Sequence, residues 1–225
     1  IGGGTWFIAC PEVGKVRIPR SRRRMGVVLR NRAVLLSTIT GFLLIGSAAS
    51  IEVGVVAVFG EEGAEAGILF GIWAIASLVG GLSMGHLPIG PWALARRMGI
   101  LFVGMAAAPF ALEFWWLAFA LVIAGIGIAP ALAVMFAIVS ASVKFSETAE
   151  AYGWLGTGQL IGAAFGSAVA GFLIDEIGPL GGFYTAIGFA LLGVIVASAF
   201  HGWHPDLRGR DASPLADTEP VQQIS

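Results

Sequence analysis

The sequence has little charge. Only 12% of its 225 residues are Asp, Glu, Lys or Arg, whereas soluble domains usually carry about 25%. Hydrophobic residues make up 57% of the chain, and the mean hydropathy is +0.87. This composition excludes an ordinary soluble domain, because too few polar side chains are present to cover a surface in water. We therefore expect an all-α polytopic membrane protein, folded as a transmembrane helical bundle.

Cysteine is nearly absent, and two motifs of common catalytic sites are missing. Cys10 is the single cysteine, which excludes an internal disulfide and argues against a structural metal site. The sequence has no P-loop lysine motif and no HExxH. Gly125 and Gly127 lie in an apolar segment rather than in a strand–turn–helix unit, so a dinucleotide site has no support. We expect neither an enzyme nor a bound cofactor or metal.

The two ends of the chain differ from its apolar middle. Residues 1–11 are too short to span a bilayer and end at a proline, so we interpret them as the end of a truncated preceding transmembrane helix. Because the chain begins with Ile and shows no signal peptide, we expect a fragment, the alternative being a complete small protein. The basic stretch 12–32 is predicted to be a cytoplasmic loop near anionic headgroups rather than a nucleic-acid site. The polar stretch 202–225 is predicted to be a disordered cytoplasmic tail.

Residues 33–201 are predicted to form a six-helix transmembrane bundle, because a helix needs about 20 apolar residues to cross the hydrocarbon core. The third segment is short and contains Pro109, and the fourth is interrupted by Gly125, Gly127 and Pro130, where we expect a kink. The expected spans are 33–59, 67–85, 98–113, 117–140, 151–174 and 181–201.

The charges predict how these spans are oriented. If the loop 12–32 is cytoplasmic and the six spans alternate, all 13 Lys and Arg lie on the inner side. The outer loops then hold only acidic charges, as the positive-inside rule requires. This distribution predicts a multi-pass protein of the cell membrane with a cytoplasmic C-terminus.

Small residues recur every four positions in two of the spans. Such spacing places them on one helical face, where they let another helix approach closely in lipid. Gln159 lies beside the small residues of the fifth span and carries a polar group into the membrane. It either forms hydrogen bonds that hold helices together or lines a substrate pathway. The two ladders are Gly158, Gly162, Gly166 and Ala170 in the fifth span and Ser77, Gly81 and Gly85 in the second.

Glu52 is the ionisable residue of the first span. A carboxylate inside a span costs about 2.5–3.5 kcal/mol on insertion scales, so it usually has a function. Proton coupling or cation binding is one interpretation, and a hydrated or structurally paired position near the outer interface is the other. Aromatic residues offer a second kind of candidate. Trp73, Tyr152 and Trp154 are suited to stacking on an organic substrate, to interface anchoring or to core packing.

Three stretches together resemble the C-terminal half of a major facilitator superfamily transporter of the bacterial efflux type. They are GFLLIGSAASIEVGVVAVF with the following AGILFGIWAIASLVGGLSMG, then AGIGIAPALAVMFAIVSASV, and then TAEAYGWLGTGQLIGAAFGSAVAGFLIDEIGPLGGFYTAIGFAL. The resemblance covers about residues 1–201. One departure lies in GGLSMGHLPIGPWALARRMG, where the family's loop aspartate is absent and only Arg96 and Arg97 match the basic end of its motif.

The resemblance implies two inverted three-helix repeats, with substrate bound between this half and a missing N-terminal six-helix half. It also implies that the first and fourth spans line the central cavity, which favours Glu52 and the Pro130 region, while the span of Gln159 helps to join the halves. The implied partners are the lipid bilayer, a small-molecule substrate and a proton as coupling ion, without nucleic acid.

The leading interpretation is therefore proton-linked efflux by alternating access, with Glu52, Gln159, Trp154 and Pro130 on the pathway. The alternative is a non-transporting six-span scaffold or channel subunit, because glycine ladders also suit oligomerisation. A membrane-embedded enzyme ranks last, since Glu52 has no matching catalytic partner within the spans.

Overall fold

The computed structural model describes residues 26–60, 63–209 and 212–215. The expected helix end at 1–11, most of the loop 12–32 and the end of the tail lie outside these residues. Within the described part, six helices are long and apolar enough to cross a membrane, which confirms the predicted helical bundle. They are α2 (Arg32–Phe59), α3 (Ala64–Met84), α4 (Ala93–Ala107), α5 (Phe114–Ser142), α6 (Thr148–Ile177) and α7 (Leu180–Ala199).

One helix boundary differs from the prediction in an informative way. The third span was expected to begin at residue 98, but α4 begins at Ala93 and takes Arg96 and Arg97 into its first turns. It ends in the 3-10 turn Ala108–Phe110, which contains Pro109. In the fourth span, α5 remains one continuous helix through Pro130. The missing amide of a proline can be tolerated there because neighbouring helices cover the freed backbone groups.

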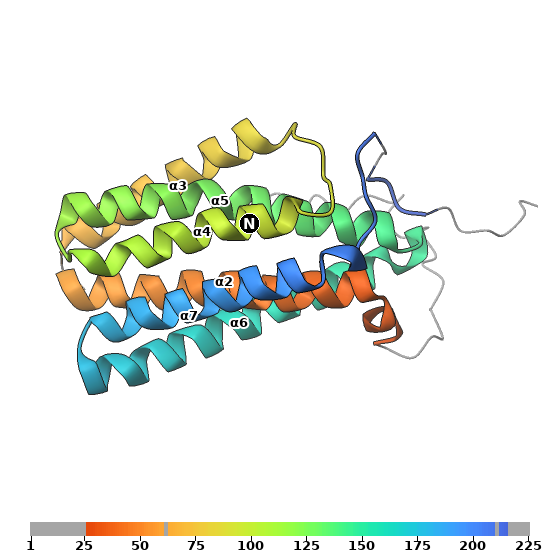
Figure 1. The fold of residues 1–225 in the computed structure, drawn as a ribbon. Helices are drawn as coiled ribbons and strands as arrows, with labels where there is room; N and C mark the ends of the chain where they lie inside the picture. The colour runs from red at the N-terminus through yellow and green to blue at the C-terminus, as the bar shows by residue number, and fades with distance from the viewer. Residues whose placement is uncertain (1–25, 61–62, 210–211, 216–225) are drawn as a thin grey trace, which may run out of the picture.

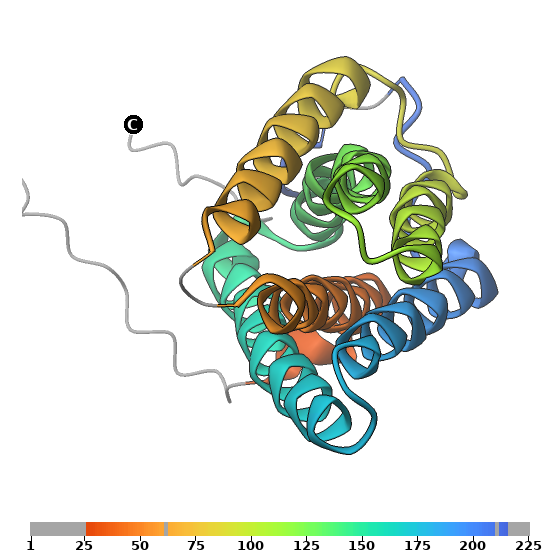
Figure 2. The same cartoon turned by 90° about the vertical axis from the view of Figure 1, so that its left-hand side faces the viewer.

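The helices lie side by side along one long axis (Figure 1). Seen down this axis, α2 and α5 are central, with α3 and α6 on one side and α4 and α7 on the other (Figure 2). The second helix of each three-helix unit packs against the first helix of the other unit, so that α3 lies on α5 and α6 lies on α2. This exchange joins α2–α4 and α5–α7 into one bundle.

The contact between α2 and α6 is a close backbone approach at the glycines of α6. A Cβ atom built at Gly158 would lie 2.7 Å from Cγ2 and 2.9 Å from the carbonyl oxygen of Thr38. At Gly162 it would overlap the backbone of Phe42, and at Gly166 that of Gly46. Dispersion contacts and interhelical hydrogen bonds hold helices together in lipid, and both need this proximity.

Two serine hydroxyls on α2 form hydrogen bonds to the neighbouring helices α6 and α7. The Ser50 hydroxyl lies 2.7 Å from the carbonyl oxygen of Gly46 and 3.0 Å from that of Gly166, so it connects α2 with α6. The Ser47 hydroxyl donates to the carbonyl oxygen of Ala186 on α7 at 2.8 Å. Both serines are buried, and the three helices are therefore joined by polar contacts as well as by packing.

The crossing of α3 over α5 is also built on glycine. A Cβ at Gly125 would lie 2.8 Å from the carbonyl oxygen of Trp73, and one at Gly80 would overlap the backbone of Ile126. On the predicted ladder of α3, Gly81 lies beside this crossing, Ser77 is half-buried and Gly85 is exposed. At this crossing the buried small residues of α3 are Ala76 and Gly80, each one position before a predicted one.

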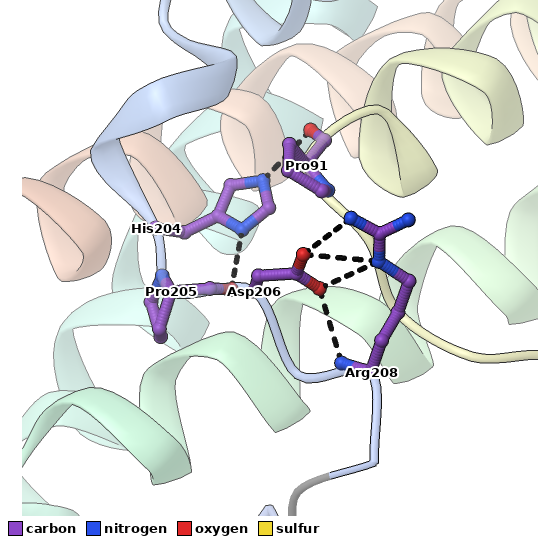
Figure 3. Close-up of polar contacts among 5 residues, drawn as sticks. All are labelled: Pro91, His204, Pro205, Asp206 and Arg208. Atoms are coloured by element: carbon purple, nitrogen blue, oxygen red, sulfur yellow. Dashed lines mark hydrogen bonds and ion pairs between the residues drawn. The ribbon is translucent and has the colours of Figure 1, made fainter.

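The first part of the C-terminal tail packs against the bundle, whereas its composition predicted disorder. His204 and Leu207 are buried, and the Leu207 amide donates to the carbonyl oxygen of Ile89 at 2.9 Å. The two ring nitrogens of His204 lie 3.1 Å from the carbonyl oxygens of Pro91 and Pro205 (Figure 3). The segment thus covers the loop between α3 and α4.

Candidate functional site: an uncovered face of α2

Glu52 lies on α2, in a strip that the rest of the described chain leaves open. Its side chain is exposed, although its neighbours Ser50 and Ile51 are fully buried. The strip recurs at helical spacing through Ile45, Ala49, Glu52 and Val56, and the other three are half-buried. No described basic side chain forms an ion pair with Glu52. A carboxylate thus stands on an otherwise apolar surface without a partner from this bundle.

The helices beside this strip are the least covered of the six. Only 22% of the apolar window of α3 and 17% of that of α6 are buried, compared with 50% for each of the other four. Both lie on the same side of the bundle, with α2 and α5 between them (Figure 2). The two poorly covered helices therefore lie on one side of the bundle, next to the central helix that carries the strip.

Gln159 lies in line with Glu52 but at another depth. A Cβ at Gly41 would lie 3.2 Å from Cγ of Gln159, so this side chain covers α2 at Gly41. Gly41 precedes Glu52 by eleven residues, which places the two polar groups about 16 Å apart along the helix axis. The Nε2 atom of Gln159 is buried and has no hydrogen-bond partner among the described residues. The two polar groups share a face but do not form one cluster.

The other predicted pathway residues lie elsewhere. Trp154 is half-buried near the start of α2, where its Cζ2 atom lies 3.8 Å from a Cβ built at Gly26. Pro130 is buried inside α5. Neither residue is brought to Glu52.

The sequence reasoning missed Phe136. Its ring on α5 meets that of Tyr152 on α6 edge to face, with centroids 5.3 Å apart, and 39% of Phe136 is exposed. Phe136 lies in a long apolar segment, where the sequence does not distinguish exposed from buried aromatic residues. Only the packing of the helices shows which of them remain accessible.

A single carboxylate on an apolar surface can exchange a proton with water or bind a cation. The described residues hold no group of three or more His, Cys, Asp or Glu side chains that could bind a metal ion.

A family model decides the class. The model of the Major Facilitator Superfamily matches residues 87–222, which include α4 to α7. The chain belongs to the major facilitator superfamily. As a member, it is a multi-pass membrane protein and a transporter, and the scaffold interpretation is not favoured. A search of curated proteins found no match to the chain.

Proposed function

We propose that the protein is a secondary active transporter that exports a small molecule from the cell by alternating access, driven by protons. In this proposal the chain is the C-terminal half of the transporter, its C-terminus is cytoplasmic, and Glu52 carries the proton. The observation that carries the proposal is the exposed Glu52 on the uncovered face of α2.

The cost of charge in lipid supports this assignment. An ionised carboxylate at the centre of a lipid-facing helix is unfavourable by about 2.5–3.5 kcal/mol or more. Glu52 lies seven residues before the end of α2 at Phe59, or about 10 Å along the axis. A face that meets water or another protein removes this cost. A second six-helix half, placed against α3 and α6, would enclose a hydrated cavity over Glu52.

Proton coupling then follows from the alternation of access. Glu52 would take a proton while the cavity is open to the outside and release it while the cavity is open to the cytoplasm. In the neutral form it can pass through a closed, dehydrated state at lower cost than in the charged form. Gln159, which covers α2 at Gly41, and Phe136, whose ring meets Tyr152 of α6, would contact the substrate, an organic molecule with an apolar part.

Export of fluorescent dyes from intact cells tests the proposal. Cells that express the complete protein should exclude dye, and a protonophore should abolish the exclusion. Glu52→Gln should remove protonophore-sensitive export and leave the amount of folded protein unchanged. Glu113→Gln is the matched control, because Glu113 is exposed just before α5 and outside the apolar strip. Normal proton-driven export by Glu52→Gln would refute the role of Glu52, and export insensitive to the protonophore would refute proton coupling.

A further inference from the structure

The start of α4 has an unusual charge arrangement. The first turn of the helix contains no acidic residue, and the residue before it, Trp92, makes no capping hydrogen bond through its side chain. Arg96 and Arg97 follow within the first five residues. Because the helix dipole makes an N-terminus electropositive, two arginines there are unfavourable unless an anion lies close by.

Arg97 is also incompletely paired. Its side chain is only 6% exposed, and its Nη2 atom donates to the carbonyl oxygen of Met84, the last residue of α3, at 3.3 Å. Its Nη1 atom is buried and has no partner among the described residues. A buried guanidinium with a free donor is costly, and an acidic partner would remove the cost.

No described carboxylate fills this role. Neither Arg96 nor Arg97 forms an ion pair within the described part of the chain. The nearby tail carboxylate of Asp206 is held by Arg208, whose Nε atom lies 2.9 Å from one carboxylate oxygen (Figure 3). These hydrogen bonds lower the pKa of Asp206 to about 2, so the carboxylate is charged but already paired.

A pocket adjoins the two arginines. It measures about 320 Å³, and apart from the arginines its walls are apolar, formed by Met84, Leu87, Pro88, Ala93 and Ile100. A second hollow shares Pro88 and Arg96 with it and extends to Trp92, which is 50% exposed. The pocket therefore has a cationic end and an apolar wall, next to an exposed tryptophan of the kind that anchors helices at the headgroup level.

We propose that this pocket binds an anionic phospholipid. The phosphate would lie at the start of α4, between Arg96 and Arg97, and would supply the acceptor that Nη1 lacks once the guanidinium turns toward it. An acyl chain would lie against Leu87 and Ile100. A lipid fits better than a soluble anion, because the site lies at the ends of two membrane-spanning helices and most of its wall is apolar. An anionic headgroup fits better than a zwitterionic one, because two positive charges lie here without a carboxylate.

Native mass spectrometry of the complete protein, purified in detergent and titrated with phosphatidylglycerol, tests the proposal. Loss of a charge-assisted contact should weaken binding about tenfold in Arg97→Gln and in Arg96→Gln. Ile100→Trp should also weaken phosphatidylglycerol binding, because the larger side chain fills the apolar part of the pocket without changing its charge. Lys144→Gln is the control, because it removes one positive charge from the loop between α5 and α6, outside the pocket.

Each outcome decides the proposal. If Arg97→Gln fails to fold, the exposed Arg96 and the half-buried Ile100 provide the test. Weaker phosphatidylglycerol binding in these variants, with wild-type binding in Lys144→Gln, supports the site. Equal binding of phosphatidylcholine, or variants that match the control, overturns it. Inorganic phosphate that competes fully with phosphatidylglycerol would assign the site to a soluble anion and overturn the lipid proposal.

Discussion

The contact at Gly166 offers the sharpest test of how the bundle is held together. A Cβ atom added there would overlap the carbonyl oxygen of Gly46 and approach its carbonyl carbon to 2.8 Å. These are backbone atoms of α2, so they cannot rotate away as a flexible side chain would. Gly166→Ala must therefore push α6 from α2, and it also stretches the contact from the Ser50 hydroxyl to the Gly166 carbonyl oxygen, now 3.0 Å long.

The size of the effect can be worked out from these contacts. Overpacking of a tight core costs about 1–3 kcal/mol, and a hydrogen bond between transmembrane helices contributes about 0.6 kcal/mol. Alanine recovers up to about 1 kcal/mol in helix propensity. We expect Gly166→Ala to lower the free energy of unfolding by about 0.5–2.5 kcal/mol.

The matched control lies on the same helix. A Cβ at Gly171 would meet no atom within 4 Å, so Gly171→Ala should leave stability unchanged or raise it by up to about 1 kcal/mol. Denaturation of the complete protein in detergent with increasing SDS, followed by circular dichroism, measures both variants. Equal stability of Gly166→Ala and Gly171→Ala would refute the claim that backbone contact joins α2 and α6.

Two further predictions concern polar groups outside this contact. Gln159→Leu removes a buried amide nitrogen without a partner and should raise the free energy of unfolding by about 1 kcal/mol. Export should fall if the amide contacts the substrate. A loss of stability in the same SDS titration would contradict the claim that the Gln159 amide nitrogen is unpaired. The hydrogen bonds from Arg208 lower the pKa of Asp206 from 3.8 to about 2, so the charged pair is complete above the ordinary pKa and is lost as the pH falls through about 2. The Leu207 amide, which lies between the two charged residues in the sequence and donates to the carbonyl oxygen of Ile89, reports on this segment. Its hydrogen-exchange protection factor should stay constant from neutral to mildly acidic pH. A fall over that range would contradict the claim that the Asp206–Arg208 pair holds the segment in place.

The helical spans could be predicted because lipid requires long apolar runs with internally satisfied backbones. The ladder of α6 was visible in the sequence for a similar reason, since a four-residue spacing keeps small residues on one face. The start of α4 was missed because Arg96 and Arg97 interrupt the apolar run. Only the packed structure shows that Arg97 is buried and bonded to the end of α3.

The candidate site was predictable in its central residue but not in its surroundings. Glu52 stands out in the sequence as a charge inside a span. Whether Gln159 or Trp154 lies near it depends on how α6 crosses α2, and hydropathy carries no such information. The polar composition of the tail predicts disorder and gives no sign that His204 and Leu207 are buried and contact the α3–α4 loop.

The central claim is that Glu52 faces a hydrated cavity in the complete protein rather than lipid. Glu52→Cys, in a background without other cysteines, can be treated with a membrane-impermeant thiol reagent, which reacts with the thiolate that forms in water. Gly188→Cys on α7 is the control, because Gly188 is exposed, meets no atom within 4 Å, and lies eight residues from the same end of the bundle. We predict rapid labelling at position 52 and slow labelling at position 188. Labelling at position 52 that is as slow as at position 188 would place Glu52 in lipid and contradict the account.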